Sequence, residues 1–497
     1  MATVKWDTPL LANGGSTPAA KHCIERAQES EMAEEAEREL PVNDRINAGR
    51  LLTDHFRCPD GFVDLTISED RSASSGYFRF GPDAICYGQL SSATPSPTIA
   101  PALQDALQNV STQGSSVHLP FDPVQIVNNL RQERYFNDHA LGRTANKSNG
   151  LIRKLYYIMR PLLTVAFRKH LQRLYLGDWE RIPFPNWPVD STVENLEEQL
   201  LVLSMKSRNL TKIPFIWFWP KGALSCTAVT HDVESAAGWN ACSELMDMDD
   251  SFGIKSAFQV IPEERYPVSP AQLDALKERG FELNIHDLNH DGNLMTDRDE
   301  FLRRAPKINR HGKTYGALGF RTAVLYRNID WFDALDFSYD MSIPNVAHLD
   351  PQRGGCCTVF PFFIGNMIEL PVTMSQDYSL FNILNDYSIN LWKKQISLIR
   401  KKHGLMQMIV HPDYISGVAE RRVYADLLGY LSDLRDQGET WIALPAEIAA
   451  WWRLRSQLKL VNEGGSWQIQ GEGKESARIA YARIVDGQLE YELTPNA

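Results

Sequence analysis

The chain has 497 residues, of which 43% are hydrophobic and 23% are charged, and its formal net charge is -11. A chain of this length exceeds what one hydrophobic core normally serves, so we expect two or three domains. The negative charge argues against nucleic acid as a partner, because no surplus of basic residues exists to neutralise phosphates.

Targeting signals and disulfides are not expected. No run of about 18 apolar residues occurs, which predicts no membrane span. Residues 1–22 lack an apolar core behind a basic start, so we predict no signal peptide and a cytoplasmic location. The seven cysteines are odd in number and stand mostly in apolar contexts, which favours reduced thiols.

The first 220 residues show no recognisable chemistry. Residues 1–50 are polar and rich in acids, which predicts a tail, and the mixed patterns of residues 51–220 predict an α+β domain of unknown role. Three elements are expected in the second segment: a hairpin turning at Gly81-Pro82-Asp83, a helix over 151–176, and a helix beginning at Ser191 with Glu194 completing a capping box.

Strands and helices alternate from residue 221 to about residue 460. This alternation predicts a parallel α/β domain over residues 221–460, followed by a small β appendage over residues 461–497. Helices are expected from Ser269, over about 380–403, and from Pro445. Strands are expected over 224–230, 256–261, 281–285, 341–344, 367–372, 405–410 and 440–444.

Titratable side chains follow several of these strands. Because functional residues of parallel α/β folds gather at the carboxyl ends of the strands, we expect these side chains to share one rim. They are Asp232 and Glu234 after the first strand, His286 and His290 after the third, His411 after the sixth, and Arg321 in a turn.

The histidine pair suggests a metal. His286 and His290 are four residues apart, which predicts that they share one face of a helical turn and reach the same ion. Two imidazoles and one carboxylate, with a fourth position open, describe a catalytic zinc centre. Such a centre also needs a base and an acid, which the second carboxylate of the first cluster and His411 could supply.

These motifs resemble the polysaccharide deacetylases of carbohydrate esterase family four, over about residues 225–455. The match covers Thr230–Glu234, the His-x-x-x-His pair, Gly319-Phe320-Arg321 and the apolar strand that ends in histidine. Val233 stands where the family has its metal-binding Asp, and the family's proline after the arginine is missing.

The resemblance implies a distorted (β/α)7 barrel and a role for each matched residue. Asp232 would be the base, Arg321 would orient it, and His411 would be the general acid. Glu234, His286 and His290 would hold one divalent metal, with zinc expected. A carboxylate should orient His411, and both Asp340 and Asp377 are open candidates.

The expected function is removal of an acyl group, N-acetyl in the first place, from a sugar or glycan precursor. Two alternatives stay open. One is hydrolysis of a C–N bond in a small cyclic amide on the same barrel, and the other is a catalytically silent glycan-binding protein. A non-haem iron oxygenase also uses two histidines and a carboxylate, but it needs no additional base–arginine pair.

Overall fold

The computed structural model describes residues 48–68, 70–91, 93–99, 102–136 and 174–494. The predicted tail lies almost wholly outside these residues, and so does all but the end of the helix expected over 151–176. Residues Asn47–Ala497 form one compact unit, and their division into the predicted domains stays a prediction. Among the described helices, none is long and apolar enough to cross a membrane.

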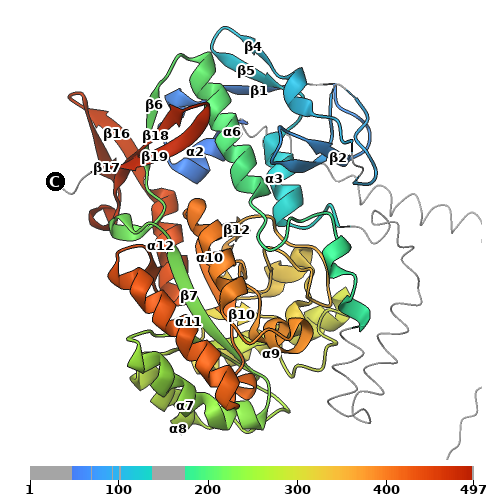
Figure 1. Ribbon diagram of the computed structural model, residues 1–497, viewed down its shortest axis with the longest axis vertical. Coiled ribbons are helices and arrows are strands. Elements are labelled where there is room, and N and C mark those ends of the chain that lie inside the picture. The colour runs from blue at the N-terminus through green and yellow to red at the C-terminus, as the bar shows by residue number, and fades with distance from the viewer. Residues whose placement is uncertain (1–47, 69, 92, 100–101, 137–173, 495–497) are drawn as a thin grey trace, which may run out of the picture. The chain divides into compact units, whose positions relative to one another are not determined.

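The described part of the N-terminal region mixes short strands and helices (Figure 1). Three strands form one sheet in the order β1-β5-β4, and β2 and β3 form the expected hairpin, with Gly81 at a φ of 72° in its turn. The elements are α2 (Arg50–Phe56), β1 (Leu65–Ile67), β2 (Gly76–Arg79), β3 (Ile85–Gly88), β4 (Ser111–Gln113), β5 (Ser116–Leu119), α3 (Pro123–Arg131) and α6 (Thr192–Ser207).

Helix α6 begins at the predicted position, but the predicted capping box is wrong. The backbone N–H of Thr192 donates to Asp190 Oδ1 at 2.8 Å, and the Ser191 side chain makes no capping hydrogen bond. Glu194 instead accepts from the Val359 N–H at 3.1 Å and from the Thr358 hydroxyl. A tertiary contact has therefore replaced the local one.

The central sheet contains nine strands in a largely parallel arrangement. Its order is β12-β13-β11-β10-β9-β8-β7-β14, with β15 also paired to β7, and only β12 runs antiparallel to its neighbour. All eight residues of β7 are buried, as expected for a strand covered on both faces. The strands are β7 (Cys226–Val233), β8 (Ala257–Val260), β9 (Glu282–His286), β10 (Gly319–Arg321), β11 (Tyr339–Asp340), β12 (Phe362–Ile364), β13 (Met367–Glu369), β14 (Leu405–Ile409) and β15 (Trp441–Ile442).

The two ends of this sheet are joined by hydrogen bonds. In the segment after β13, the N–H groups of Thr373 and Met374 donate to Gln407 O of β14, at 3.2 and 3.0 Å. The Thr373 hydroxyl donates to Leu405 O at 2.7 Å. The sheet is therefore curled, and the predicted α/β class is confirmed.

Six helices lie between and after the strands of this sheet. Helix α8 has the predicted Ser269 cap, whose Oγ accepts from the Gln272 N–H at 3.3 Å. The helix expected over 380–403 is interrupted, because Asn385 takes a φ of 55° and α10 begins only at Asn390. The helices are α7 (Ala236–Ser251), α8 (Pro270–Glu278), α9 (Arg298–Tyr315), α10 (Asn390–Lys401), α11 (Val418–Asp436) and α12 (Pro445–Gln457).

The C-terminal strands form two units. Strands β16 (Lys459–Glu463) and β17 (Ser466–Gln470) are a hairpin. Strand β18 (Ile479–Val485) pairs with β19 (Gln488–Leu493) on one side and with β6 (Lys212–Ile216) on the other (Figure 1). The end of the chain is thus hydrogen-bonded to a strand that precedes the central sheet.

Candidate functional site

The polar rim predicted from the sequence is present at the carboxyl end of the parallel strands. Asp232 is the seventh residue of β7, and Glu234 directly follows that strand. His286 and Arg321 are the last residues of β9 and β10, where the two are register partners. His411 follows β14 by two residues. Parallel strands end on the same side of a sheet, so all these side chains converge.

Glu234, His286 and His290 form a group that could hold a metal ion, because one ligand atom from each lies within 4.8 Å of the others. Glu234 Oε1 is 2.9 Å from His290 Nε2 and 4.0 Å from His286 Nε2. Ligands at about 2.0–2.2 Å from a tetrahedral zinc would be separated by similar distances. The spacing therefore fits one ion after small side-chain adjustments.

The hydrogen bond made by the His286 imidazole also fits a metal. His286 Nδ1 faces the Arg321 carbonyl oxygen at 3.2 Å, so Nδ1 carries the proton and the Nε2 lone pair points into the site. The Nε2 atom of His286 is buried and has no hydrogen-bond partner among the described residues, while that of His290 faces Glu234 Oε1 at 2.9 Å. A buried nitrogen without a partner is costly, and a bound cation would satisfy it.

The local structure around the histidines differs from the prediction. His286 ends a strand and His290 lies in the following loop with a φ of 52°, so they do not share a helical turn. The loop nevertheless brings their rings to a centroid distance of 5.0 Å. Arg265 Nη2 lies 3.3 Å from His290 Nδ1, a contact with no signal in the sequence.

Charges within the group depend on one another. Burial acts to raise the pKa of Glu234, but His290, His286 and His411 together hold it well below its usual range. Burial acts to lower the pKa of His290, and the Glu234 carboxylate reverses this and raises it. Glu234 is therefore ionised, as a metal ligand must be.

Asp232 and Arg321 form a buried ion pair beside this group. Arg321 Nη1 donates to Asp232 Oδ1 at 2.6 Å and to the Thr230 hydroxyl at 2.9 Å, while its Nε donates to Met341 O at 2.9 Å. Burial acts to raise the pKa of Asp232, but Arg321 and His286 outweigh it and the pKa is lowered. The other Asp232 oxygen, Oδ2, is 3.8 Å from His286 Nε2.

Asp377, and not Asp340, contacts His411. The Asp377 carboxylate accepts from His411 Nδ1 at 2.7 Å and from the His411 backbone N–H at 2.8 Å. Burial acts to lower the pKa of His411, yet Asp377, Glu234 and Asp232 raise it to about 10. The Nε2–H of the imidazolium points toward the site, since Glu234 Oε1 lies 3.8 Å away. The sequence left this choice of carboxylate open.

His231 lies apart from this group. Side chains of a strand alternate between its faces, so His231 points away from the face that carries Asp232. It is fully buried and contacts Val410 O at 3.0 Å and Asp249 Oδ2 at 3.1 Å. Tyr424 of α11 packs against its ring. The environment of His231 is that of a core residue.

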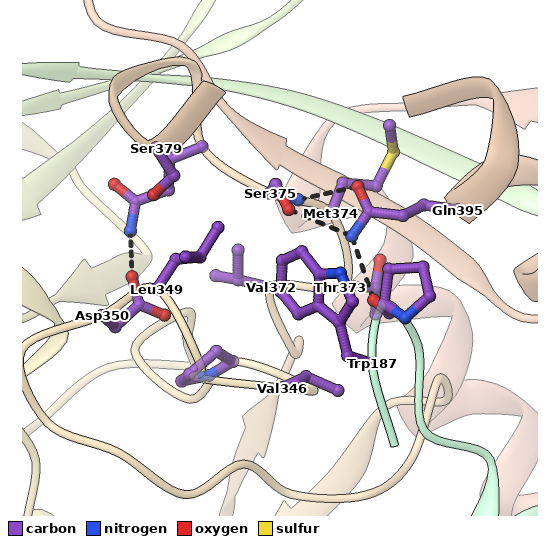
Figure 2. Close-up of a pocket in the computed structure, with 13 residues that line it drawn as sticks. Trp187, Val346, Leu349, Asp350, Val372, Thr373, Met374, Ser375, Ser379 and Gln395 are labelled. Atoms are coloured by element: carbon purple, nitrogen blue, oxygen red, sulfur yellow. Dashed lines mark hydrogen bonds between the residues drawn. The ribbon is translucent and has the colours of Figure 1, made fainter. Parts of the chain in front are cut away.

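A separate cavity is lined in part by the segment that directly precedes Asp377. Figure 2 shows Trp187 and Asp350 among its lining residues, together with Ser375 and Gln395. Gln376, the residue before Asp377, donates to Asp350 Oδ1 at 3.0 Å. Burial raises the pKa of Asp350 to about 6. None of the predicted site residues lines this cavity.

Known proteins are similar to this chain in structure alone, and over only part of its length. No family model matches the chain, and no curated protein matches it. Solved structures of polysaccharide deacetylases match about half of the chain.

Three of these structures illustrate the likeness. A putative polysaccharide deacetylase from Mycobacterium smegmatis is 17% identical, with a TM-score of 0.40 over 50% of this chain and 96% of that one. Peptidoglycan deacetylase PdaC from Bacillus subtilis is 12% identical, with a TM-score of 0.30 over 46% and 93%. A family 4 acetyl xylan esterase from Clostridium thermocellum is 13% identical, with a TM-score of 0.29 over 46% and 91%. Similarity at this level carries no conclusion about activity.

Proposed function

We propose that the protein is a metal-dependent hydrolase that removes an acyl group, N-acetyl in the first place, from a sugar or glycan. The observation that carries the proposal is the convergence of Glu234, His286 and His290 beside the Asp232–Arg321 and His411–Asp377 pairs. A carboxylate held ionised and a histidine held protonated are the base and acid that hydrolysis of an amide requires. The curled and largely parallel sheet supports the distorted (β/α)7 barrel implied by the resemblance.

Each residue has a defined role in this proposal. Glu234, His286 and His290 would hold the metal, with zinc expected from the donor set. A metal bound there would polarise the acyl carbonyl and lower the pKa of water. Arg321 keeps Asp232 ionised and oriented, so that Asp232 Oδ2 takes the proton of the attacking water.

Asp377 has a matching role on the opposite side of the site. It keeps the His411 imidazolium oriented, and His411 Nε2 donates its proton to the departing amine. The product would be acetate and a free amino sugar when the acyl group is acetyl.

The first experiment measures metal content by mass spectrometry on the purified protein, before and after incubation with zinc. We expect about one equivalent in the wild type, and none in a variant carrying His286→Ala and His290→Ala. His311→Ala is the matched control, because His311 pairs with Glu263 outside the group. No metal in the wild type, even after zinc is added, contradicts the proposal.

The second experiment tests the reaction by acetate release from a panel of N-acetylated sugars and oligosaccharides. Asp232→Asn should keep the metal and lose activity, because the amide cannot accept the proton. Activity that survives Asp232→Asn rules out this mechanism. Metal binding without acetate release from any member of the panel, but with hydrolysis of a cyclic amide, would favour the small-molecule alternative.

A further inference from the structure

Two fully buried carboxyl groups lie next to each other outside the group that could hold a metal. Asp340 of β11 and Glu369 of β13 are register partners on adjacent parallel strands, and neither is exposed to solvent. Register partners on adjacent strands carry their side chains on the same face of a sheet, so the two carboxyl groups lie side by side in the interior. The mechanism above uses neither of them.

The hydrogen bonds around the pair leave one oxygen without a donor. Asp340 Oδ2 accepts from the Ser342 N–H at 2.9 Å, and Asp340 Oδ1 accepts from the Ser342 hydroxyl at 2.8 Å. Glu369 Oε1 accepts from the Ile343 N–H at 2.9 Å. Glu369 Oε2 is buried and has no donor. Two ionised carboxylates in contact would leave that oxygen unsatisfied, whereas one proton on it would make a hydrogen bond to Asp340.

The charges near the pair point to one proton and not two. Arg321, on β10, is the cation that faces both groups, and it acts to lower the pKa of each. The Cys356 thiol also faces Glu369. Because Arg321 is already paired with Asp232, a single negative charge on the Asp340–Glu369 pair is stabilised, while a second charge would face no free cation among the described residues.

The pair is connected to the end of β10 through one hydroxyl. Ser342 Oγ, which donates to Asp340, also accepts from the backbone N–H of Thr322 at 2.9 Å. Thr322 follows Arg321 directly. The position of the arginine backbone therefore depends on the orientation of the Asp340 carboxylate.

We propose that Asp340 and Glu369 share a single proton, and that the singly charged pair is a positioning device that holds the end of β10, and with it Arg321, in place. The pair itself contacts neither Asp232 nor the groups that could hold a metal. This inference does not depend on the proposed reaction.

The proton makes the contribution of the pair to stability depend on pH. Burial, reinforced by the neighbouring Asp340, raises the pKa of Glu369 well above its usual range. The folded state then binds a proton that the unfolded state has released above a pH of about 4. The contribution is complete below that pH and is lost as the pH rises toward the raised pKa.

Glu369→Gln tests the proposal, because the amide replaces the shared proton with a permanent donor. Gln at this position can accept from Ile343 N–H and donate to Asp340, so the variant should fold. At each pH, the melting temperature of the variant minus that of wild type is measured. This difference should rise steadily from about pH 5 to about pH 9. A difference that stays flat or falls with pH overturns the proposal.

Asp340→Asn is the matched variant on the other side of the pair. Asp340 accepts two hydrogen bonds from Ser342, one on each carboxylate oxygen. In an Asn at this position the NH2 group replaces one of these oxygens, so two hydrogen-bond donors would face each other. This variant should melt several degrees below wild type, although it removes the same charge. Equal melting temperatures for the two variants contradict the arrangement.

Infrared difference spectroscopy detects the proton directly. One carbonyl stretch of a protonated carboxylic acid that is present in wild type at neutral pH should be missing from the spectrum of each variant, while the stretches of other protonated acids stay. One folded variant therefore suffices for the test. Glu194→Gln is the control, because burial raises the pKa of Glu194 to about 8 and its own band should disappear independently. If wild type and both variants show the same bands, the pair carries no proton.

Discussion

Burial has opposite outcomes at the two titratable residues assigned to proton transfer. Asp232 and His411 are both buried. Arg321 and His286 lower the pKa of Asp232, whereas Asp377 raises the pKa of His411 to about 10. In each case a specific partner outweighs desolvation. At neutral pH the aspartate is therefore ionised and the histidine is protonated, which are the states in which a base and an acid act.

Asp377→Asn should move the pH dependence of the proposed activity. Without the carboxylate, the pKa of His411 should fall by about 1–3 units, so the alkaline limb of the pH–rate profile shifts to lower pH. The sign follows from the acid role, because His411 must be protonated to donate. Asp350→Asn is the control, since Asp350 lies in the separate cavity. An unchanged alkaline limb in the Asp377 variant would remove His411 from the mechanism.

Arg321→Met should destabilise the fold as well as the site. The guanidinium is fully buried and the Asp232 side chain is 5% exposed, so the variant leaves a buried carboxylate without its cation. We expect a loss of about 3–5 kcal/mol in the free energy of unfolding by chemical denaturation. Adding Asp232→Asn should recover part of this loss. Strictly additive effects would show that the two residues do not interact.

At the scale of secondary structure, the sequence predicts most strands of the central sheet near their observed bounds, including the short β13 and β15, but it does not predict β10 or β12. β7 is rich in β-branched residues and β14 is largely apolar, and both lie close to the bounds that these patterns predict. β10 has only three residues, Gly319–Arg321, and was read as a turn. It is a strand because it pairs with β9 and β11, which no local pattern reveals.

The same distinction holds within the candidate site. The residues that converge at the carboxyl end of the sheet could be predicted from the sequence, since most of them follow apolar runs. The choice of Asp377 over Asp340 could not be made, because both follow apolar segments. Only the folded chain separates them, as Asp377 contacts His411 while Asp340 contacts Ser342 and Glu369. The metal ligands and their roles stay predictions until metal content is measured.

Gly319→Ala tests how tightly β10 is packed against β11. A Cβ at this position would overlap the buried Tyr339 ring, whose hydroxyl is hydrogen-bonded to Asn284 at 2.9 Å. Because the ring cannot move freely, we expect a loss of about 1–3 kcal/mol in the free energy of unfolding. Gly61→Ala is the control, since no atom lies within 4 Å of the Cβ there. Equal free energies of unfolding for the two variants would mean that the Tyr339 ring of β11 can move aside at little cost.

At the scale of the whole described molecule, segments far apart in sequence depend on one another. Ala482 of β18 is 1% exposed and pairs with Ile213 of β6, while its neighbour Arg483 faces solvent. Ala482→Asp should therefore lower the melting temperature strongly and broaden or split the transition, because a buried charge would separate β18 from β6. Arg483→Asp should have little effect, since it breaks only an exposed ion pair with Glu492. If Ala482→Asp lowers the melting temperature measured by calorimetry only slightly, β6 and β18 do not depend on each other for folding.

The pairing of β6 with β18 also has a consequence for biosynthesis. A ribosome releases β6 more than 260 residues before β18 is available, as their bounds of 212–216 and 479–485 require. During that interval one edge of β6 offers unpaired N–H and C=O groups, which can pair with any other extended chain. Newly made protein should therefore need chaperone protection until β18 has been synthesised, and chains that stop before β18 should be the ones that aggregate.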